Sequence, residues 1–425
     1  MKKNLINWSN YLFSKINMKF SSIALNIPLQ NNLKTLEYID ATDIQQQAIP
    51  FILANKDVMA RAKTGTGKTA AFALPILNKL MAEQSEACNT STLVLAPTRE
   101  LVQQIYANFT QYSRDIDIRI VAVFGGVSIK PQISSIKQGV NIIIATPGRL
   151  LDLLSNDHLH LQNISMLVFD EADRMLDLGF KAEIDQIMQQ IPQERQTLLF
   201  SATFDDSIYK LSKTLLNNPQ VITVDDKNEI ATNIEQLIYT VDSDRKRELL
   251  SYLIGSKNWQ QVLIFTRTKQ TADELAKEMC KDGIKAQSLH GDKSQGARDK
   301  ALADFKSGKV RALVATDVAA RGIDIVDLEF VVNYELPFVA EDYVHRIGRT
   351  GRAGKSGLAL SLVSPSEEWL LTAIEKVIDE RLLQQWLPGY EPDLTKTEAP
   401  KRSPNKQKAR REALQRNKGK NRRRK

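Results

Sequence analysis

The 425-residue sequence has few of the residues that build metal centres and disulfide frameworks. It contains 2 cysteines and 4 histidines, and Cys88 and Cys280 are far apart in the chain. Neither cysteine stands in a metal-ligand spacing, which disfavours a structural zinc site. Two thiols in so long a chain also give no sign of a disulfide framework and suit a reducing compartment.

Long hydrophobic runs are missing as well. No apolar stretch approaches the roughly 20 residues of a membrane-spanning helix. Residues 1–20 include Lys2 and Lys3 but no continuous apolar segment and no small-residue cleavage site, so we expect no signal peptide. These absences disfavour secretion and membrane transport, and we predict a cytoplasmic protein without a membrane partner.

Positive charge is scarce in most of the chain and concentrated at its end. The whole sequence has 58 Lys and Arg against 50 Asp and Glu, a formal net charge of +8. Residues 395–425 hold 14 of these basic residues and 2 acidic ones, a net of +12, which leaves residues 1–394 at −4. This tail has few large apolar residues, so we expect it to be disordered alone and to bind a polyanion by counterion release.

Short apolar runs alternate with segments of helical spacing throughout the rest of the chain. Nearly continuous apolar strands between helices predict buried parallel sheets of the doubly wound α/β type. The expected strands form two series, at 57–60, 93–96, 121–124, 142–145, 166–169, 198–200 and 221–224, and then at 262–265, 312–315, 330–333 and 358–363.

Two series of strands predict two domains in tandem. We place the first at residues 20–224 and the second at 233–394, joined by the polar residues 225–232. Residues 1–19 would form an N-terminal extension, and 395–425 the basic tail.

A glycine-rich segment follows the first expected strand and opens a helical stretch. The segment Ala62-Lys63-Thr64-Gly65-Thr66-Gly67-Lys68-Thr69 matches a phosphate-binding loop, with Ala in the first position instead of Gly. Glycines let backbone N–H groups converge on phosphate oxygens at a helix N-terminus. Lys68 would reach the β and γ phosphates, and the Thr69 hydroxyl would bind Mg²⁺.

An acidic group follows the apolar run 166–169. Asp170, at the end of a buried strand downstream of a phosphate loop, is the expected second Mg²⁺ anchor. The adjacent Glu171 would act as a general base on a water molecule that attacks the γ-phosphate. Such a group alone would more often be a solvated turn, but together with the phosphate loop it indicates a nucleotide hydrolase.

The segment Asp170-Glu171-Ala172-Asp173, taken with the motifs below, resembles the DEAD-box family of RNA helicases over roughly residues 20–363. The resemblance implies two RecA-like domains and ATP hydrolysis coupled to local, non-processive unwinding of short RNA duplexes or remodelling of RNA–protein particles. It also implies that Ser201-Ala202-Thr203 couples the nucleotide state to unwinding through the Ser201 and Thr203 hydroxyls, with Ser201 near Asp173.

The residues 41–45, Ala-Thr-Asp-Ile-Gln, resemble the adenine-reading motif of the same family. The amide of Gln45 can pair with N6 and N7 of adenine, which would select ATP over GTP. Phe20 is the candidate stacking ring, although an aromatic of the core is the alternative. Two departures stand out, because Lys63 replaces the usual Gln and Glu37 occupies a position where the family usually has Gly.

The resemblance further assigns RNA contacts to loops at strand ends, where open α/β sheets bind their ligands. Each loop alone would more often be an ordinary connection, but their order along the chain matches the family. In the first domain the residues are Pro97, Thr98, Arg99, Gly125, Gly126, Thr146, Pro147, Gly148 and Arg149, and in the second they are Arg267, Gln295, Arg298 and Thr316.

Residues 345–352, His-Arg-Ile-Gly-Arg-Thr-Gly-Arg, carry three arginines without an acidic neighbour in the sequence. A cluster of this kind favours an anion. By resemblance, Arg349 and Arg352 are arginine fingers on the γ-phosphate of ATP, and His345 and Arg346 have coupling or structural roles. Asp324, in the segment after Thr316, is the expected ribose contact.

Two other functions stay open on the sequence alone. A non-enzymatic RNA clamp would not need the intact set of Lys68, Glu171, Arg349 and Arg352, and a DNA translocase would not need the motif at Gln45. We expect a monomer that binds RNA with little sequence readout. Ribosomal particles and mRNA-decay complexes are both candidate partners.

Overall fold

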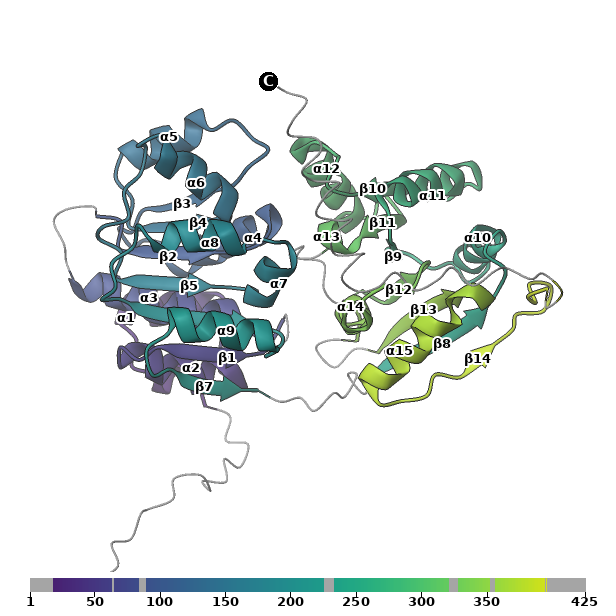
Figure 1. The fold of residues 1–425 in the computed structure, drawn as a ribbon, viewed down its shortest axis with the longest axis horizontal. Helices are drawn as coiled ribbons and strands as arrows, with labels where there is room; N and C mark the ends of the chain where they lie inside the picture. Colours follow the sequence, from purple (N-terminus) through teal and green to yellow (C-terminus); the bar gives the residue numbers. More distant parts are fainter. Residues whose placement is uncertain are drawn as a thin grey trace, which may run out of the picture. The chain divides into compact units, whose positions relative to one another are not determined.

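The computed structural model describes residues 18–62, 65–83, 89–224, 233–320, 328–351, 356–393 and 395. The chain divides into two compact units, Met1–Val224 and Asp225–Lys425, and each contains one seven-stranded sheet (Figure 1). The linker expected at 225–232 lies outside the described residues, as do most of the expected N-terminal extension and tail. No helix in the described ranges has the length and apolarity needed to cross a membrane.

The sheet of the first unit is parallel throughout, in the order β3-β4-β2-β5-β6-β1-β7. Its strands are β1 (Val58–Arg61), β2 (Thr92–Leu95), β3 (Ile120–Val123), β4 (Ile142–Ala145), β5 (Met166–Phe169), β6 (Gln196–Ser201) and β7 (Gln220–Thr223). The strands β2, β4, β5 and β6 are buried along their whole length.

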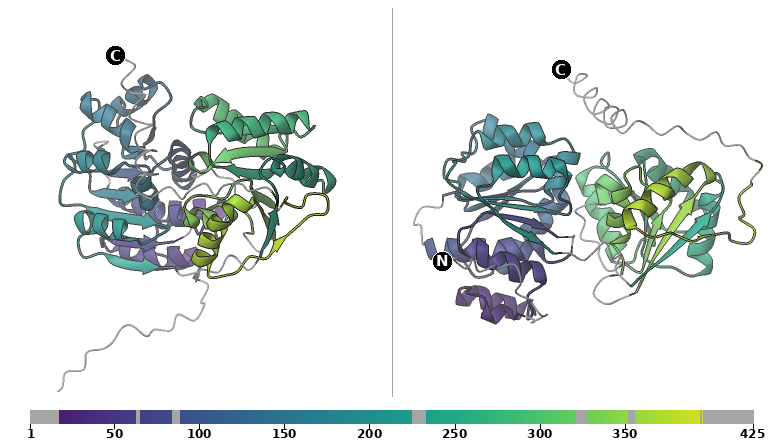
Figure 2. Two further views of the ribbon diagram at one scale, coloured as in Figure 1. Left: turned by 45° about the vertical axis from the view of Figure 1, so that its right-hand side comes forward. Right: turned by 60° about the horizontal axis from the view of Figure 1, so that its bottom comes forward.

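Helices cover both faces of this sheet. Successive strand residues point to opposite sides, and because these residues are apolar, both faces must be buried. In β5, Met166 and Val168 pack into one core, and Leu167 and Phe169 into the other. One face is covered by α1 (Ile27–Thr35), α2 (Asp43–Leu53), α3 (Lys68–Glu83) and α4 (Arg99–Tyr112), and the other by α5 (Lys130–Lys137), α6 (Pro147–Ser155), α7 (Ala172–Asp177), α8 (Lys181–Met188) and α9 (Asp206–Leu215) (Figure 2).

The second unit repeats this plan with a parallel sheet in the order β10-β11-β9-β12-β13-β8-β14. Its strands are β8 (Ile234–Thr240), β9 (Val262–Thr266), β10 (Ala286–Leu289), β11 (Ala312–Thr316), β12 (Phe330–Asn333), β13 (Gly357–Val363) and β14 (Gln384–Gln385). One face packs against α10 (Lys246–Ser256) and α11 (Lys269–Lys281), and the other against α12 (Gln295–Lys306), α13 (Asp317–Ala320), α14 (Ala340–Ile347) and α15 (Glu368–Ile378).

After α15, residues 382–393 run back along the edge of this second sheet. The strand β14 pairs with β8, and the Arg245 guanidinium donates to the Gly389 carbonyl at 2.7 Å and lies 4.8 Å from the Tyr390 ring. The Asp393 backbone N–H donates to the Asp242 carboxylate at 3.2 Å. This strap therefore fixes the chain to the second unit up to the start of the basic tail.

The predicted doubly wound α/β fold is confirmed, and all the expected strands are present to within a few residues. The sequence reading missed β8, β10 and β14. In β8 only Ile238 is buried, and β10 and β14 are the edges of their sheet. Strands of this kind lack the continuous apolar run that identified the others.

Candidate functional site

The glycine-rich loop joins β1 to α3 at the carboxyl edge of the first sheet. Gly65 and Gly67 have φ angles of +88° and +90°, a left-handed conformation that strongly favours glycine. A Cβ on Gly67 would also overlap the Gln45 amide and lie 3.0 Å from the Thr42 hydroxyl. The loop geometry thus requires glycine at position 67. Lys63 and Thr64 lie outside the described residues.

Lys68, the first residue of α3, supplies a buried ammonium group to this loop. Its side chain is 6% exposed, and Nζ makes no hydrogen bond within the described part of the chain. A buried charge without hydrogen bonds is costly, and phosphate oxygens would satisfy it. The adjacent Thr69 is half-buried and offers a hydroxyl at the same helix N-terminus.

Asp170 follows β5 and is also buried. The pKa of Asp170 is raised from 3.8 to about 6, chiefly by burial; Lys68 opposes this rise and the neighbouring Glu171 adds to it. A carboxylate held where its charge is disfavoured suits a cation. The oxygen donors of Thr69 and Asp170 are the type that Mg²⁺ prefers, so these residues fit the predicted metal.

Glu171 has an unusual backbone conformation. Its φ and ψ are 53° and 51°, and it is the N-cap of α7. A residue other than glycine in this region costs roughly 1–2 kcal/mol, and such residues cluster at functional sites. The side chain is 8% exposed, so the predicted base lies in a largely water-excluded position.

Asp173 connects α7 to the end of β6. Its Oδ2 accepts hydrogen bonds from the backbone N–H groups of Ala202 and Thr203 at 3.1 and 3.2 Å and from the Thr203 hydroxyl at 3.3 Å. The direct side-chain contact therefore comes from Thr203, whereas the Ser201 hydroxyl accepts from the Thr203 N–H at 3.4 Å.

Gln45 links α2 to the phosphate loop. Its Oε1 accepts from the Thr42 N–H at 2.8 Å, and its Nε2 donates to the Gly67 carbonyl at 3.1 Å. Each amide atom retains one further hydrogen-bonding position, which leaves adenine recognition possible. The side chain is 2% exposed.

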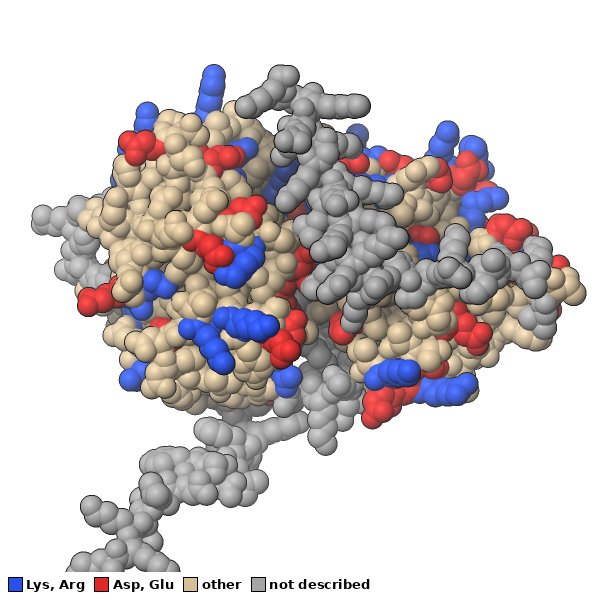
Figure 3. Space-filling model, in the orientation of Figure 1, with Lys and Arg blue, Asp and Glu red and all other residues tan. Residues whose placement is uncertain are grey.

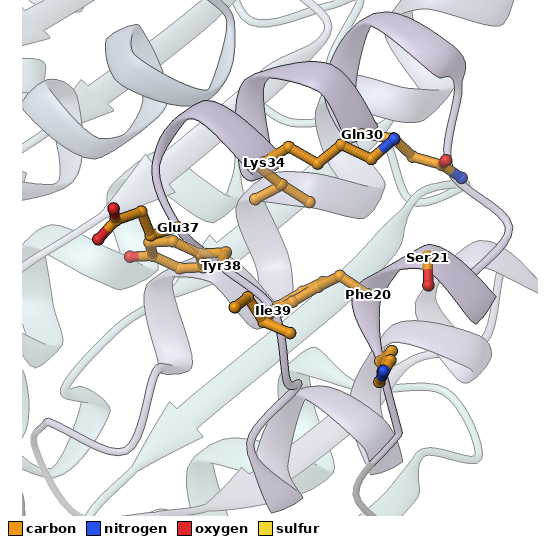
Figure 4. Close-up of a pocket in the computed structure, with 9 residues that line it drawn as sticks. Phe20, Ser21, Gln30, Lys34, Glu37, Tyr38 and Ile39 are labelled. Carbon is orange, nitrogen blue, oxygen red and sulfur yellow. The ribbon is translucent and has the colours of Figure 1, made fainter.

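Phe20 lies in the hydrophobic core with 3% exposure, and its ring centroid is 5.9 Å from that of Tyr38. Both rings line a pocket of about 590 Å³ beneath α1, where Figure 4 shows Gln30 and Lys34 above them. The described residues that line this pocket include neither Gln45 nor the phosphate loop. Glu37, at its rim, has a φ of +59°, which explains why glycine suits that position.

The predicted RNA-binding residues of the first unit follow β2, β3 and β4, which are neighbours in the sheet. The Thr98 hydroxyl caps α4 by accepting from the Leu101 N–H at 3.2 Å, and Thr146 is the N-cap of α6, with Pro147 in the first turn. The nucleotide loops follow the neighbouring strands β5, β6 and β1. One edge of the sheet is thus divided between the two sets of loops.

Two arginines border these RNA-side loops. Gly126 has a φ of +80°, and a Cβ there would overlap the Arg99 guanidinium, whereas a Cβ on Gly125 would have ordinary contact with it at 3.8 Å. Arg149 donates from Nη2 to the Val127 carbonyl at 3.1 Å. Both guanidinium groups therefore pack beside backbone that follows β3.

In the second unit, Arg267 follows β9 and is held by two carboxylates. Its Nη2 lies 3.2 Å from Glu335 Oε1 and 2.7 Å from Glu367 Oε1. Thr316 ends the neighbouring strand β11, and Gln295 and Arg298 are buried in the first turn of α12.

The sequence reading did not find Lys246 and Glu367, which form a buried ion pair beside Arg267. Burial lowers the pKa of Lys246, although Glu367 opposes this effect. Burial alone would raise the pKa of Glu367, but Lys246 and Arg267 outweigh it and bring that pKa below its usual range. The only sequence signal was Ser364 three residues before Glu367, a capping box that the structure contains.

Arg346 is almost fully buried and makes a two-pronged ion pair with Asp317, through Nε at 2.6 Å and Nη2 at 2.8 Å. Arg346 therefore meets a carboxylate of the protein itself, and the inference that the arginines of residues 345–352 need a bound anion does not hold for it. The coupling role of Arg346 stays a prediction. Arg349 is buried and His345 half-buried, while Arg352 and Asp324 lie outside the described residues.

Comparison with known proteins decides the family. The family model for DEAD/DEAH box helicases matches residues 42–211, and that for the helicase conserved C-terminal domain matches residues 245–354. The chain belongs to the DEAD-box family of ATP-dependent RNA helicases.

Among DEAD-box relatives, the ATP-dependent RNA helicase CshA of Listeria monocytogenes is 40% identical over 373 residues, which span 88% of this chain and 71% of that protein. The DEAD-box ATP-dependent RNA helicase CshA of Bacillus subtilis is 40% identical over 363 residues, 85% of this chain and 73% of that protein.

Solved DEAD-box structures agree with the fold. Mss116 bound to single-stranded RNA and UDP-BeF has a TM-score of 0.80 at 29% identity, with 89% of this chain and 82% of that chain covered. Dbp5 of S. cerevisiae bound to RNA and ADP BeF3 has a TM-score of 0.77 at 32% identity, with 86% and 95% covered. The predicted tandem RecA-like architecture is confirmed, and the roles of individual site residues stay predictions.

Proposed function

We propose that the first unit binds ATP through the phosphate loop, with Lys68 on the β and γ phosphates and Gln45 on adenine. The observation that carries this proposal is the buried Lys68 ammonium, which makes no hydrogen bond to the described residues. Phe20 is the proposed stacking ring, and it would need to turn one face toward the base. Thr69 and Asp170 would hold Mg²⁺, which when bound neutralises phosphate charge.

Glu171 is the proposed general base. Its backbone has the left-handed conformation and lies directly between β5 and α7. The sheet and the helix therefore fix the position of this residue. It would accept a proton from the water that attacks the γ-phosphate. Arg349 and Arg352 of the second unit would stabilise the charge that develops on the phosphate oxygens.

RNA is proposed to bind the loops after β2, β3 and β4 in the first unit and those after β9 and β11 in the second. Capped helix N-termini and glycine backbone favour phosphate and 2′-OH contacts, which carry little sequence information. Because the base and the arginines belong to different units, hydrolysis would require both units to act together. Local strand separation would accompany that step.

The test is Glu171→Gln, measured by phosphate release in the presence of RNA. We expect at least a ~100-fold loss of turnover, the usual contribution of a general base, with ATP and RNA binding retained. Glu194→Gln, the same change at an exposed position, is the control and should turn over as the wild type does. Wild-type turnover by Glu171→Gln would remove Glu171 as the base.

Arg349→Ala tests the second unit's contribution. We expect the RNA-stimulated rate to fall by roughly 1,000-fold, in the range known for arginine fingers, with a much smaller change in ATP affinity. An unchanged rate would refute this role. Stimulation by RNA and by DNA of the same sequence, measured in the same assay, separates RNA-directed from DNA-directed activity.

The basic tail is proposed to be a tether that raises RNA affinity without sequence selection. On the face shown in Figure 3, acidic and basic side chains intersperse over the described surface, in keeping with a net charge of −4 for residues 1–394. The strap at residues 382–393 ends at the carboxyl edge of the second sheet, where Asp242 anchors Asp393 just before the tail begins.

Deleting residues 395–425 should weaken RNA binding and flatten its dependence on salt, because fewer counterions are released. Turnover at saturating RNA should change little. A chain whose tail is replaced by uncharged residues of equal length is the control and should behave like the deletion. RNA affinity equal to that of the intact chain at low salt would contradict the tether.

We further propose that the protein acts in the cytoplasm as a monomer, with ribosomal particles or mRNA-decay complexes as its targets. The support is general, since the relatives are bacterial RNA helicases. Crosslinking in cells and sequencing of the bound RNA would distinguish the two targets, and light scattering of the purified chain would test the monomer.

A further inference from the structure

Glu335 contacts both the predicted RNA-binding residue Arg267 and the predicted coupling residue Arg346 in the second unit. It follows β12, which pairs in parallel with β9 so that Asn333 is opposite Phe265. The residues just beyond these strand ends, Glu335 and Arg267, are therefore neighbours at the carboxyl edge of the sheet. Their side chains are only 17% and 20% exposed.

The carboxylate of Glu335 accepts hydrogen bonds from both the backbone and the side chain of Arg267. Its Oε2 accepts from the Arg267 backbone N–H at 2.7 Å, and its Oε1 accepts from Nη2 at 3.2 Å. Glu367 also accepts from Nη2, at 2.7 Å, and the Phe338 ring lies 4.8 Å from the guanidinium carbon. Nε and Nη1 make no hydrogen bond to the described residues, so they remain available to a phosphate.

The backbone of Glu335 makes a second connection. Its carbonyl accepts from Arg346 Nη1 at 2.6 Å, and Arg346 is fixed by the two-pronged pair with Asp317, which directly follows Thr316. Arg349 follows Arg346 by three residues in the chain. A single residue thus joins the proposed RNA contact at Arg267 to the segment that carries a proposed arginine finger.

We propose that Glu335 is a positioning residue that couples RNA binding at Arg267 to the placement of residues 346–349. This inference rests on the proposed roles of Arg267 and Arg349. A phosphate bound to Nε and Nη1 shifts the Arg267 guanidinium toward it. Glu335 moves with Arg267 because its carboxylate accepts hydrogen bonds from both the side chain and the backbone of that residue. Its carbonyl transmits the displacement to Arg346.

The experiment measures RNA affinity of the full chain by fluorescence anisotropy, with and without a non-hydrolysable ATP analogue. The ratio of the two affinities is the coupling between the sites, which typically amounts to ~5–150-fold. In Glu335→Gln, which keeps the size of the side chain but removes its charge, we expect this ratio to fall about tenfold or to near one. Analogue binding without RNA should stay as in the wild type.

Glu329→Gln is the matched control, because Glu329 is exposed and precedes the same strand at its other end. It should keep the wild-type ratio. If Glu335 acts through Arg267, adding Glu335→Gln to Arg267→Ala should lower the ratio no further. Additive effects, or a wild-type ratio in Glu335→Gln, would overturn the inference.

Two further results separate this inference from the proposed function. If Arg267→Ala binds RNA as the wild type does, the proposed RNA contact is wrong, and coupling through it is overturned as well. If Arg267→Ala weakens RNA binding but Glu335→Gln leaves the ratio intact, only the coupling role is overturned. Should Glu335→Gln fail to fold, Glu335→Asp keeps the charge but withdraws the carboxylate from Arg267 and should lower the same ratio; an unchanged ratio is then the refuting result.

Discussion

The buried pair of Lys246 and Glu367 gives a test of what stabilises the second unit. Their side chains are 4% and 7% exposed. Lys246 Nζ donates to the Glu367 carboxylate, to the Leu362 carbonyl at 2.7 Å and to the Tyr334 carbonyl at 3.1 Å, so all three N–H groups are used. Glu367→Gln preserves the shape but leaves the Lys246 charge without its carboxylate.

Removing one partner of a buried pair costs about 3–5 kcal/mol. The amide of glutamine can still accept a hydrogen bond, so we expect the lower end, about 3 kcal/mol. For a domain of this size each kcal/mol shifts the melting temperature by about 2–4 °C, which predicts a loss of about 6–12 °C. Because the folded pKa of Glu367 is lowered from 4.5, the wild-type advantage is present above pH 4.5 and shrinks as the pH falls below it.

Tryptophan fluorescence during urea unfolding isolates the second unit. Three of the four tryptophans, Trp259, Trp369 and Trp386, belong to it, and Trp8 can be replaced by Phe in every variant. Glu368→Gln, at the exposed neighbouring position, is the control and should unfold as the wild type does. A loss below 1 kcal/mol in Glu367→Gln, or equal losses in both variants, would refute the buried-pair reasoning.

Three further predictions concern the first unit. In metal-free buffer, Asp170→Asn should raise the free energy of unfolding by up to ~3 kcal/mol at pH 8, because the folded pKa of about 6 exceeds the reference value of 3.8; circular dichroism should show this gain disappearing as the pH falls from 6 to 4. Gly126→Ala should weaken RNA binding and lower stability by roughly 1–2 kcal/mol, whereas Gly125→Ala, without the clash with Arg99, should leave stability unchanged. Glu37→Gly should relieve the left-handed strain and raise stability by up to ~1 kcal/mol in thermal unfolding; no gain would contradict that account.

Much of the architecture could be predicted because buried parallel strands carry a strong local signal. The runs at 142–145, 166–169 and 330–333 are apolar at every or nearly every position, and the structure has strands with those bounds. Glycine at position 67 could also be predicted, because it belongs to a local sequence motif. The left-handed φ angle of Gly67 gives the physical reason for it.

Contacts between segments that are distant in the chain have no comparable signal in the sequence. Arg346 has no acidic neighbour in the segment 345–352, yet Asp317 reaches it from another strand end, 29 residues earlier in the chain. Arg267 pairs with Glu335 and Glu367, 68 and 100 residues away. Which strand ends meet depends on the order of strands in the sheet, and that order cannot be read from the spacing of residues along the chain.

These pairings change what the charge of the protein implies for RNA binding. Arg267 and Arg346 are matched by carboxylates in the structure, so neither adds a net positive field. RNA recognition by the two units would then depend on the donors that these pairs leave available, such as Nε and Nη1 of Arg267. Donors of this kind give short-range contacts, whereas the net charge of +12 in residues 395–425 gives a salt-dependent attraction. The two contributions should therefore separate with ionic strength, the tail governing how much RNA is captured and the paired arginines governing whether capture leads to hydrolysis.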